Sequence, residues 1–164
     1  MLIFLNTITE NTSNKLSSIT SGIHQITYQT NGLGTRINQT VNGQVTNYTL
    51  DQETELTQVL EDDSNTYLYG LGRISQENAE NIDYYLGDGL GSVRQVLLGD
   101  SARTVVLARD YASYGEVKTT SGTGTSAFGF TGEMQSGGLV HLRARDYATH
   151  AYISRLLSFV LLSN

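Results

Sequence analysis

The stretch at residues 84–98, which reads YYLGDGLGSVRQVLL, constrains the fold of this chain more than any other. It opens with two tyrosines and a leucine, which suit a pleated surface. Three glycines in five positions follow, at Gly87, Gly89 and Gly91. Glycine at this density indicates a backbone that takes positive φ or passes close to another strand. The stretch therefore predicts a strand, a glycine turn and a second strand.

The residues after the turn support this interpretation, because alternate side chains of a strand point to opposite faces. We expect one face to carry Val93, Gln95 and Leu97 and the other to carry Ser92, Arg94, Val96 and Leu98. The glycines do not form a dinucleotide loop, since the G-x-G-x-x-G spacing and a following helical pattern are both missing. Asp88 is expected to cap its own turn through its side chain.

Strand and turn signals recur about every twenty residues, an interval at which repeat architectures are suspected. Asn42-Gly43 is the strongest hairpin signal in the chain. The predicted strands are 26–28, 35–41, 44–50, 57–60, 66–69, 92–98, 104–109 and 139–143, and 119–126 is predicted to be a flexible Gly/Thr/Ser loop. Because a single hairpin is marginally stable, we expect the hairpins to lie side by side in a curved sheet. Their tyrosines would then form cross-strand aromatic pairs.

Composition excludes several classes of protein. The 164 residues include 17 Gly and 10 Tyr but no Pro, Cys or Trp. Without cysteine there is no disulfide framework and no thiolate zinc site. The formal net charge is −6 and no basic block occurs, which argues against nucleic acid as a partner. Residues 1–5 are too short for a signal-peptide core, and no apolar run is long enough for a membrane span.

Several segments together resemble the RHS repeat-associated core domain in order and spacing. They read YLYGLGRI from Tyr67, YYLGDGLGSVR from Tyr84, YASYGEV from Tyr111, FGFTGE from Phe128 and LRAR from Leu142. The motif residues that carry the resemblance are Tyr69, Gly70, Gly72, Arg73, Tyr84, Tyr85, Asp88, Gly91, Ser92, Arg94, Tyr114, Gly115, Phe130, Gly132, Arg143 and Arg145.

The resemblance implies an all-β chain of consecutive antiparallel hairpins of YD-repeat type. The C-terminal residues depart from the family pattern and predict a short helical or apolar tail. In that family the core ends a tyrosine-rich shell that encloses a toxin domain, and the proteins are bacterial and secreted or on the cell surface. We expect a polar leader or linker at 1–24, the core domain at 25–155 and a degenerate apolar tail at 156–164. Residues 28–36 resemble a YD repeat, with Gln29 in place of the usual Asp.

The arginine segment raises an enzymatic alternative. Arg143 and Arg145 are expected on one face of a strand, paired with carboxylates such as Asp110 or Glu133. In many relatives this strand leads into an acidic segment where an intramolecular aspartyl protease releases the toxin. Here the expected acidic motif is absent, and Asp146 is the one acidic side chain after Arg145. We therefore predict no peptidase activity.

Other candidate sites have ordinary structural explanations. His24, His141 and His150 are scattered and do not form a catalytic or metal constellation. The acidic turn at 61–65 lacks the ligand spacing and glycine of a calcium loop. Asp88 and Asp110 could form a carboxylate pair, but turn capping explains Asp88 better, and Ser92 lacks the G-x-S-x-G context of a nucleophile.

The sequence thus predicts a structural segment of an RHS-type shell that takes part in toxin encapsulation or delivery without being the toxin. Its partners would be the rest of the shell or a cognate toxin domain, with no cofactor and no metal. The alternatives are a residual self-cleaving aspartyl peptidase and a carbohydrate-binding or adhesive module whose tyrosines stack on sugars.

Overall fold

The computed structural model describes residues 7–21, 23–54, 56–136, 138–143, 145–149 and 156–157. The chain divides into two compact units. Unit 1 contains residues 1–63, 143–146 and 156–164, and unit 2 contains residues 64–142 and 147–155.

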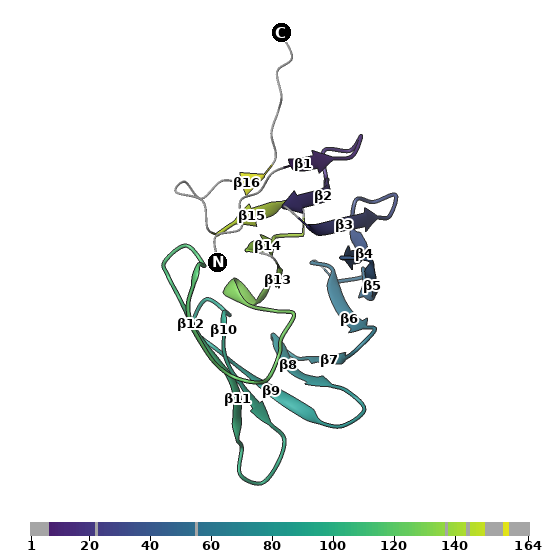
Figure 1. Ribbon diagram of the computed structural model, residues 1–164. Coiled ribbons are helices and arrows are strands. Elements are labelled where there is room, and N and C mark those ends of the chain that lie inside the picture. The colour runs from purple at the N-terminus through teal and green to yellow at the C-terminus, as the bar shows by residue number, and fades with distance from the viewer. Residues whose placement is uncertain are drawn as a thin grey trace. The chain divides into compact units, whose positions relative to one another are not determined.

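Unit 1 is built from six consecutive antiparallel strands (Figure 1). They are β1 (Thr7–Glu10), β2 (Leu16–Ser21), β3 (His24–Thr30), β4 (Arg36–Val41), β5 (Gln44–Asp51) and β6 (Gln58–Asp62). Each strand pairs with the next one along the chain. Its buried apolar residues are Leu16, Ile19, Tyr28 and Tyr48, so half of the large core side chains here are tyrosines.

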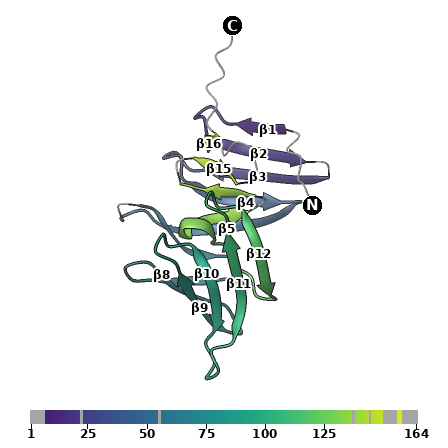
Figure 2. The same ribbon diagram turned by 90° about the vertical axis from the view of Figure 1, so that its left-hand side faces the viewer.

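Unit 2 repeats this plan, and Figure 2 shows several of its strands side by side. They are β7 (Thr66–Tyr69), β8 (Arg73–Glu77), β9 (Ile82–Gly87), β10 (Val93–Leu98), β11 (Val105–Tyr111) and β12 (Val117–Gly122). A single 3-10 turn, η1 (Phe130–Gly132), and the hairpin of β13 (Met134–Ser136) and β14 (Leu139–His141) follow. The described residues also form the strands β15 (Asp146–Ala148) and β16 (Leu156–Leu157). The predicted all-β class with consecutive antiparallel hairpins is therefore confirmed.

One type of five-residue turn recurs in both units, at 11–15, 31–35, 88–92 and 112–116. In each copy the N–H of the first residue donates to the carbonyl of the fifth, and the N–H of the fourth donates to the carbonyl of the first. The fourth residue has positive φ, between +54° at Asn14 and +84° at Gly115. This is a type I turn followed by a left-handed residue that forms a bulge, and a register shift lies beside each copy.

Side chains reinforce three of these turns. Asn11, Asn31 and Asp88 each occupy the first position, where the side-chain Oδ1 accepts two backbone N–H groups of the same turn. Asp88 accepts from Leu90 and Ser92 at 3.0 Å each, which is the turn capping expected from the sequence. Asn42-Gly43 also forms the expected two-residue hairpin, with φ of +51° and +87°.

Two segments that were predicted to be loose are regular strands. Residues 1–24 were expected to be a polar leader or linker, but 7–10 and 16–21 within them form the hairpin of β1 and β2. Residues 119–126 were expected to be a flexible loop, but β12 extends to Gly122 and pairs with β11. Both predictions were wrong because Thr and Ser fit a strand as well as a loop, and pairing with the neighbouring strand determines the outcome.

The predicted faces of β10 were also wrong. Val93 and Val96 are both buried, although strict alternation puts them on opposite faces. The pairing with β9 shifts between Val93 and Gln95, so an extra residue is inserted at Arg94. A bulge of this kind reverses the facing of the residues beyond it.

The predicted tail falls largely outside the described residues. Within it, Leu156 and Leu157 form the short strand β16. No helix in the described part of the chain is long and apolar enough to cross a membrane.

Candidate functional site

In unit 2 a half-buried arginine, Arg73, lies close to four aromatic rings. Arg73 begins β8, immediately after the turn at 70–72. Its guanidinium carbon lies 3.0 Å from the ring centroid of Phe128. The ring centroids of Tyr69, Tyr85 and Tyr67 lie 5.3, 5.8 and 5.9 Å from the same carbon. These distances place the cation within reach of the negative faces of four rings.

Hydrogen bonds fix the orientation of this guanidinium group. Arg73 Nη1 donates to the backbone carbonyl of Gly132 at 3.0 Å, and its Nε donates to Tyr69 Oη at 3.2 Å. Tyr67 meets Phe128 edge-to-face, with centroids 4.9 Å apart and planes at 89°. We call residues 126–133 the Phe128 segment. The arginine is therefore held both by β7 and by the Phe128 segment.

The Phe128 segment is bound to β10 and β11 through its backbone. The Val93 N–H donates to the Gly129 carbonyl at 2.9 Å, and the Thr131 N–H donates to Ser92 Oγ at 3.0 Å. Arg109 Nη1 also reaches the Phe128 carbonyl, at 3.3 Å. Ser92 is fully buried, and its hydroxyl is engaged in this contact. The motif serine thus holds a segment 39 residues away in sequence.

Phe130 of η1 covers the turn at 112–116. A Cβ added at Gly115 would lie 2.6 Å from a Phe130 ring atom, so only glycine fits under the ring. The Phe130 ring also lies against Tyr111, with centroids 5.8 Å apart. Gly132 lies beside the turn at 88–92, where a Cβ added at Gly132 would be 2.9 Å from the Gly91 carbonyl oxygen.

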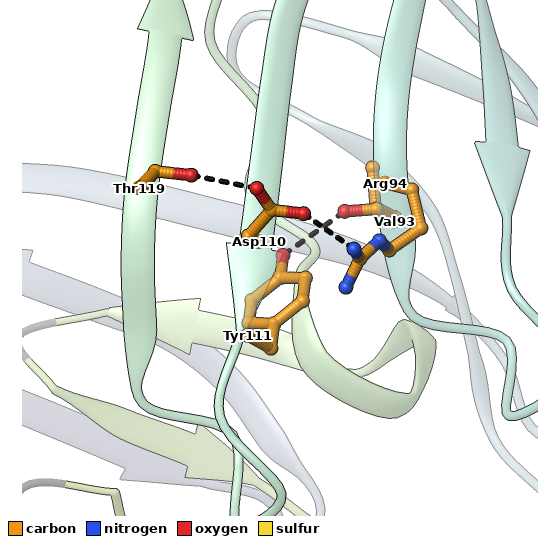
Figure 3. A network of polar contacts seen from close by, with 5 residues as sticks. All are labelled: Val93, Arg94, Asp110, Tyr111 and Thr119. Carbon is orange, nitrogen blue, oxygen red and sulfur yellow. Dashed lines mark hydrogen bonds and ion pairs between the residues drawn. The ribbon is translucent and has the colours of Figure 1, made fainter.

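A second network joins β10, β11 and β12 (Figure 3). Arg94 forms an ion pair with Asp110, which also accepts a hydrogen bond from Thr119 Oγ1 at 2.8 Å. Tyr111 Oη donates to the Val93 carbonyl at 3.0 Å, and burial raises the pKa of its phenol. Since the Arg94 and Asp110 side chains are 36% and 59% exposed, their ion pair contributes little stability.

Unit 1 contains a smaller cluster of the same kind, and it is buried. The Arg36 guanidinium carbon lies 3.7 Å from the Tyr28 ring centroid, and Arg36 Nη2 lies 2.8 Å from Asp146 Oδ1. Burial raises the pKa of Tyr28 to about 12, which the positive charge of Arg36 partly opposes. Burial also raises the pKa of Tyr48, whose hydroxyl has no hydrogen-bond partner in the described part of the chain.

The arginine segment differs from its prediction. β14 ends at His141, Arg143 has φ of +56°, and Arg143 and Arg145 both lie in bends, so they do not share the face of a strand. Asp110, proposed as their partner, pairs with Arg94. Sequence reasoning also missed the partner of Asp146, because Arg36 lies 110 residues away.

The remaining motif residues have structural positions. Gly70 and Gly72 form the turn before β8, where the Gly70 N–H donates to the Gly72 carbonyl. Tyr84 lies on β9 with the Arg103 guanidinium carbon 5.4 Å from its ring centroid, and Tyr114 is exposed at a turn tip. The tyrosines were expected to pair with one another, whereas the aromatic contacts that the structure defines here join Tyr67 and Tyr111 to phenylalanines.

The candidate acidic and histidine residues do not form a metal cluster within the described part of the chain. No group of three or more His, Cys, Asp or Glu side chains among them is arranged to hold a metal ion. Asp63 of the acidic turn accepts a hydrogen bond from the Asn47 N–H at 3.0 Å. Asp88 and Asp110, considered as a carboxylate pair, each have their own partners, and His150 lies outside the described residues.

Comparison with known proteins identifies the fold. No family model matches the chain, and no curated protein matches it. Among solved structures it is similar to a crystal structure of TcdB2-TccC3, with a TM-score of 0.68 and 16% identity over 93% of this chain. It is also similar to a Photorhabdus luminescens Tc holotoxin pore, with a TM-score of 0.65 and 18% identity over 93% of this chain. The chain spans 9% and 8% of the lengths of those two chains. At these identities the likeness shows the fold alone: the chain has an RHS-like β fold that is present as a small part of Tc toxin chains.

Proposed function

We propose that this chain is a shell segment of an RHS-type toxin protein, with a structural role in enclosing or delivering a toxin domain. The observation that carries the proposal is the Arg73 cluster. Four aromatic rings and two hydrogen bonds hold this arginine in contacts that join strands to the Phe128 segment. Such an arrangement stabilises the sheet and its Phe128 segment.

Two further observations support a shell role. Each unit consists of strands in chain order, a plan that can be extended by adding hairpins at its ends. The fold likeness covers nearly all of this chain but less than a tenth of the Tc toxin chains. The partners would therefore be further shell hairpins and the enclosed domain, outside the cell.

The peptidase alternative receives no support from the surroundings of Asp146. An aspartyl mechanism needs two carboxylates that share a proton near the scissile bond. Asp146 is instead ion-paired with the buried Arg36 at 2.8 Å, so its carboxylate is engaged in a structural contact within unit 1. We therefore favour the structural role over self-cleavage.

The test begins with the reading frames beside the gene for this chain. The chain is produced together with the hairpin polypeptide encoded upstream and the domain encoded downstream, and the purified assembly is treated with a broad-specificity protease. We expect the downstream domain to survive digestion with the chain present and to be degraded when the chain is omitted. An Arg73→Gln assembly should protect less well, and an assembly with the exposed Leu33→Ser change serves as the control. Equal digestion with and without the chain would contradict the proposal.

A further inference from the structure

Two of the bulged turns differ at their first residue by a single chemical group. The turn at 31–35 reads NGLGT, and the turn at 88–92 reads DGLGS. In both turns the Oδ1 atom of the first residue accepts the N–H groups of the third and fifth residues, all at 3.0 Å. Asn31 therefore places an amide where the chain elsewhere places the carboxylate of Asp88, and both side chains cap the turn in the same way.

The capping contacts prepare the Asn31 side chain for attack by the next backbone nitrogen. Such an attack on the amide carbon puts negative charge on Oδ1, and hydrogen-bond donors that already point at this oxygen stabilise the charge. The donors are the N–H groups of Leu33 and Thr35, which lie beyond Gly32 in the chain. The Asn31 side chain consequently lies along the Gly32 peptide, whose nitrogen is the attacking atom.

The attacking and the departing groups are both accessible. Gly32 is exposed, and no atom would lie within 4 Å of a Cβ added there. Neither the Gly32 N–H nor the Nδ2 atom of Asn31 has a hydrogen-bond partner among the described residues. Water can therefore take the proton from the Gly32 nitrogen, and the side-chain nitrogen of Asn31 can leave without breaking a contact.

We infer that Asn31-Gly32 is a self-modification site, where the side-chain amide of Asn31 is replaced by a carboxylate. The Gly32 nitrogen gives its proton to water and forms a bond to Asn31 Cγ. The Cγ–Nδ2 bond breaks, and the departing nitrogen takes a proton from solvent and leaves as ammonia. Water then opens the five-membered imide at one of its two carbonyls, which gives aspartate or isoaspartate. The sum is amide and water to carboxylic acid and ammonia, so nothing is oxidised or reduced.

The turn at 11–15 shows what opposes the same reaction. Asn11 Oδ1 also accepts two N–H groups of its own turn, at 2.9 and 3.0 Å. The next residue is Thr12, whose β-branched side chain hinders the approach of its nitrogen. In addition, Asn11 Nδ2 donates to Thr30 Oγ1 at 3.3 Å, so the departing group is held.

The other Asn-Gly pair of unit 1 differs in the direction of its capping contact. Asn42 Oδ1 accepts the N–H of Gln25 at 2.9 Å, and Gln25 belongs to the neighbouring strand β3. The donor therefore holds the Asn42 side chain against β3 and not along the peptide of Gly43. The folded chain should accordingly favour reaction at Asn31, although both asparagines precede a glycine.

The aspartate product fits the turn, because Asp88 caps the same kind of turn. A Cβ added at Gly34 would lie 3.1 Å from Lys15 Cε and 3.9 Å from Lys15 Nζ, so an ammonium group lies beside the turn at 31–35. The new carboxylate would thus be close to a positive charge. The isoaspartate product adds a methylene group to the main chain and breaks the capping pattern. The inference does not depend on the proposed shell role, since it rests on the turn itself.

Peptide mass spectrometry of the full-length chain tests the inference. The chain is incubated at neutral pH, folded in buffer and unfolded in urea, and conversion is followed at each asparagine. In the folded chain we expect Asn31 to convert at least about tenfold faster than Asn11, because glycine leaves the attacking nitrogen unhindered. Asn31 should also convert faster than Asn42. In urea the rates at Asn31 and Asn42 should become similar, because the capping contacts are lost.

A matched variant separates the reaction from the fold. Gly32→Thr copies the residue at the same position of the turn at 11–15, and it should stop conversion at Asn31 while leaving Asn42 unchanged. Circular dichroism verifies that the variant is folded. Equal rates at Asn31 and Asn42 in the folded chain would overturn the inference. So would conversion at Asn31 that Gly32→Thr does not slow, or an Asn31 that stays intact in the folded chain while the chain in urea converts.

Discussion

Three glycines of unit 2 form a matched series that separates backbone strain from steric overlap. Gly89, Gly91 and Gly115 all lie in bulged turns of the same type. Gly89 is outside the left-handed region, and no atom lies within 4 Å of an added Cβ. Gly91 has φ of +82° with the nearest atom at 3.7 Å, and Gly115 has φ of +84° with Phe130 at 2.6 Å. Alanine at position 89 should therefore cause neither backbone strain nor steric overlap. Alanine at position 91 should cause backbone strain alone, and alanine at position 115 should cause both.

The expected magnitudes differ enough to be measured. A left-handed residue other than glycine costs roughly 1–2 kcal/mol, so Gly91→Ala should destabilise by about that amount. Gly115→Ala adds overpacking against the Phe130 ring, roughly 1–3 kcal/mol more. Gly89→Ala should be neutral, or stabilising by up to about 1 kcal/mol, because it restricts the unfolded chain. At about 2–4 °C per kcal/mol, the Tm should fall by about 2–8 °C for Gly91→Ala.

Thermal melts followed by circular dichroism, with urea titrations beside them, would measure these changes. The expected order of stability is Gly89→Ala, then Gly91→Ala, then Gly115→Ala. Combining Gly115→Ala with Phe130→Leu should recover part of the loss, because the smaller side chain makes room for the methyl group. Equal melting temperatures in the three single variants would refute both the turn assignment and the position of Phe130. A result in which Gly89→Ala lowers the melting temperature most would also refute them.

Other predictions concern the two arginine clusters. Arg73→Gln should destabilise unit 2 by about 2–4 kcal/mol, since cation–π contacts and two hydrogen bonds are lost; unchanged urea midpoints would contradict this. Asp146→Asn should lower the free energy of unfolding by about 3–5 kcal/mol because it leaves Arg36 buried and unpaired. After long incubation, mass spectrometry should find the natural chain uncut. A discrete cut near 143–146 that Asp146→Asn abolishes would disprove the structural role of Asp146. Burial raises the pKa of Tyr28 from 10 to about 12 in the folded protein. The neutral phenol therefore adds about 2–3 kcal/mol to the free energy of unfolding below pH 10, and this is lost as the pH rises toward 12. Thermal melts from pH 8 to 12 should show a smaller decrease of Tm with pH for Tyr28→Phe than for the natural chain. Tyr48→Phe should leave stability unchanged or higher, because it removes a buried hydroxyl that has no partner among the described residues, and a loss above about 1 kcal/mol in a urea titration would contradict this.

Local signals in the sequence determined the class of fold. Asn42-Gly43 and the turn at 88–92 form from their own residues, because positive φ and side-chain capping are decided within five positions. The alternation of apolar and polar residues between such turns was enough to predict hairpins in chain order. The motif segments that resembled an RHS core predicted the same fold that the structural comparisons found.

The tertiary structure decided which residues meet across long separations. Arg36 and Asp146 are 110 residues apart, and Ser92 meets Thr131 across 39. No periodic pattern encodes such pairs, because each depends on a long connection that brings distant residues together. The bulge at Arg94 likewise arises from pairing with β9, and it reversed the facing of Val96 that strict alternation predicted. The sequence alone thus determined the hairpins, whose geometry is local, while the buried clusters needed the packed sheet, because only packing brings their charges and rings together.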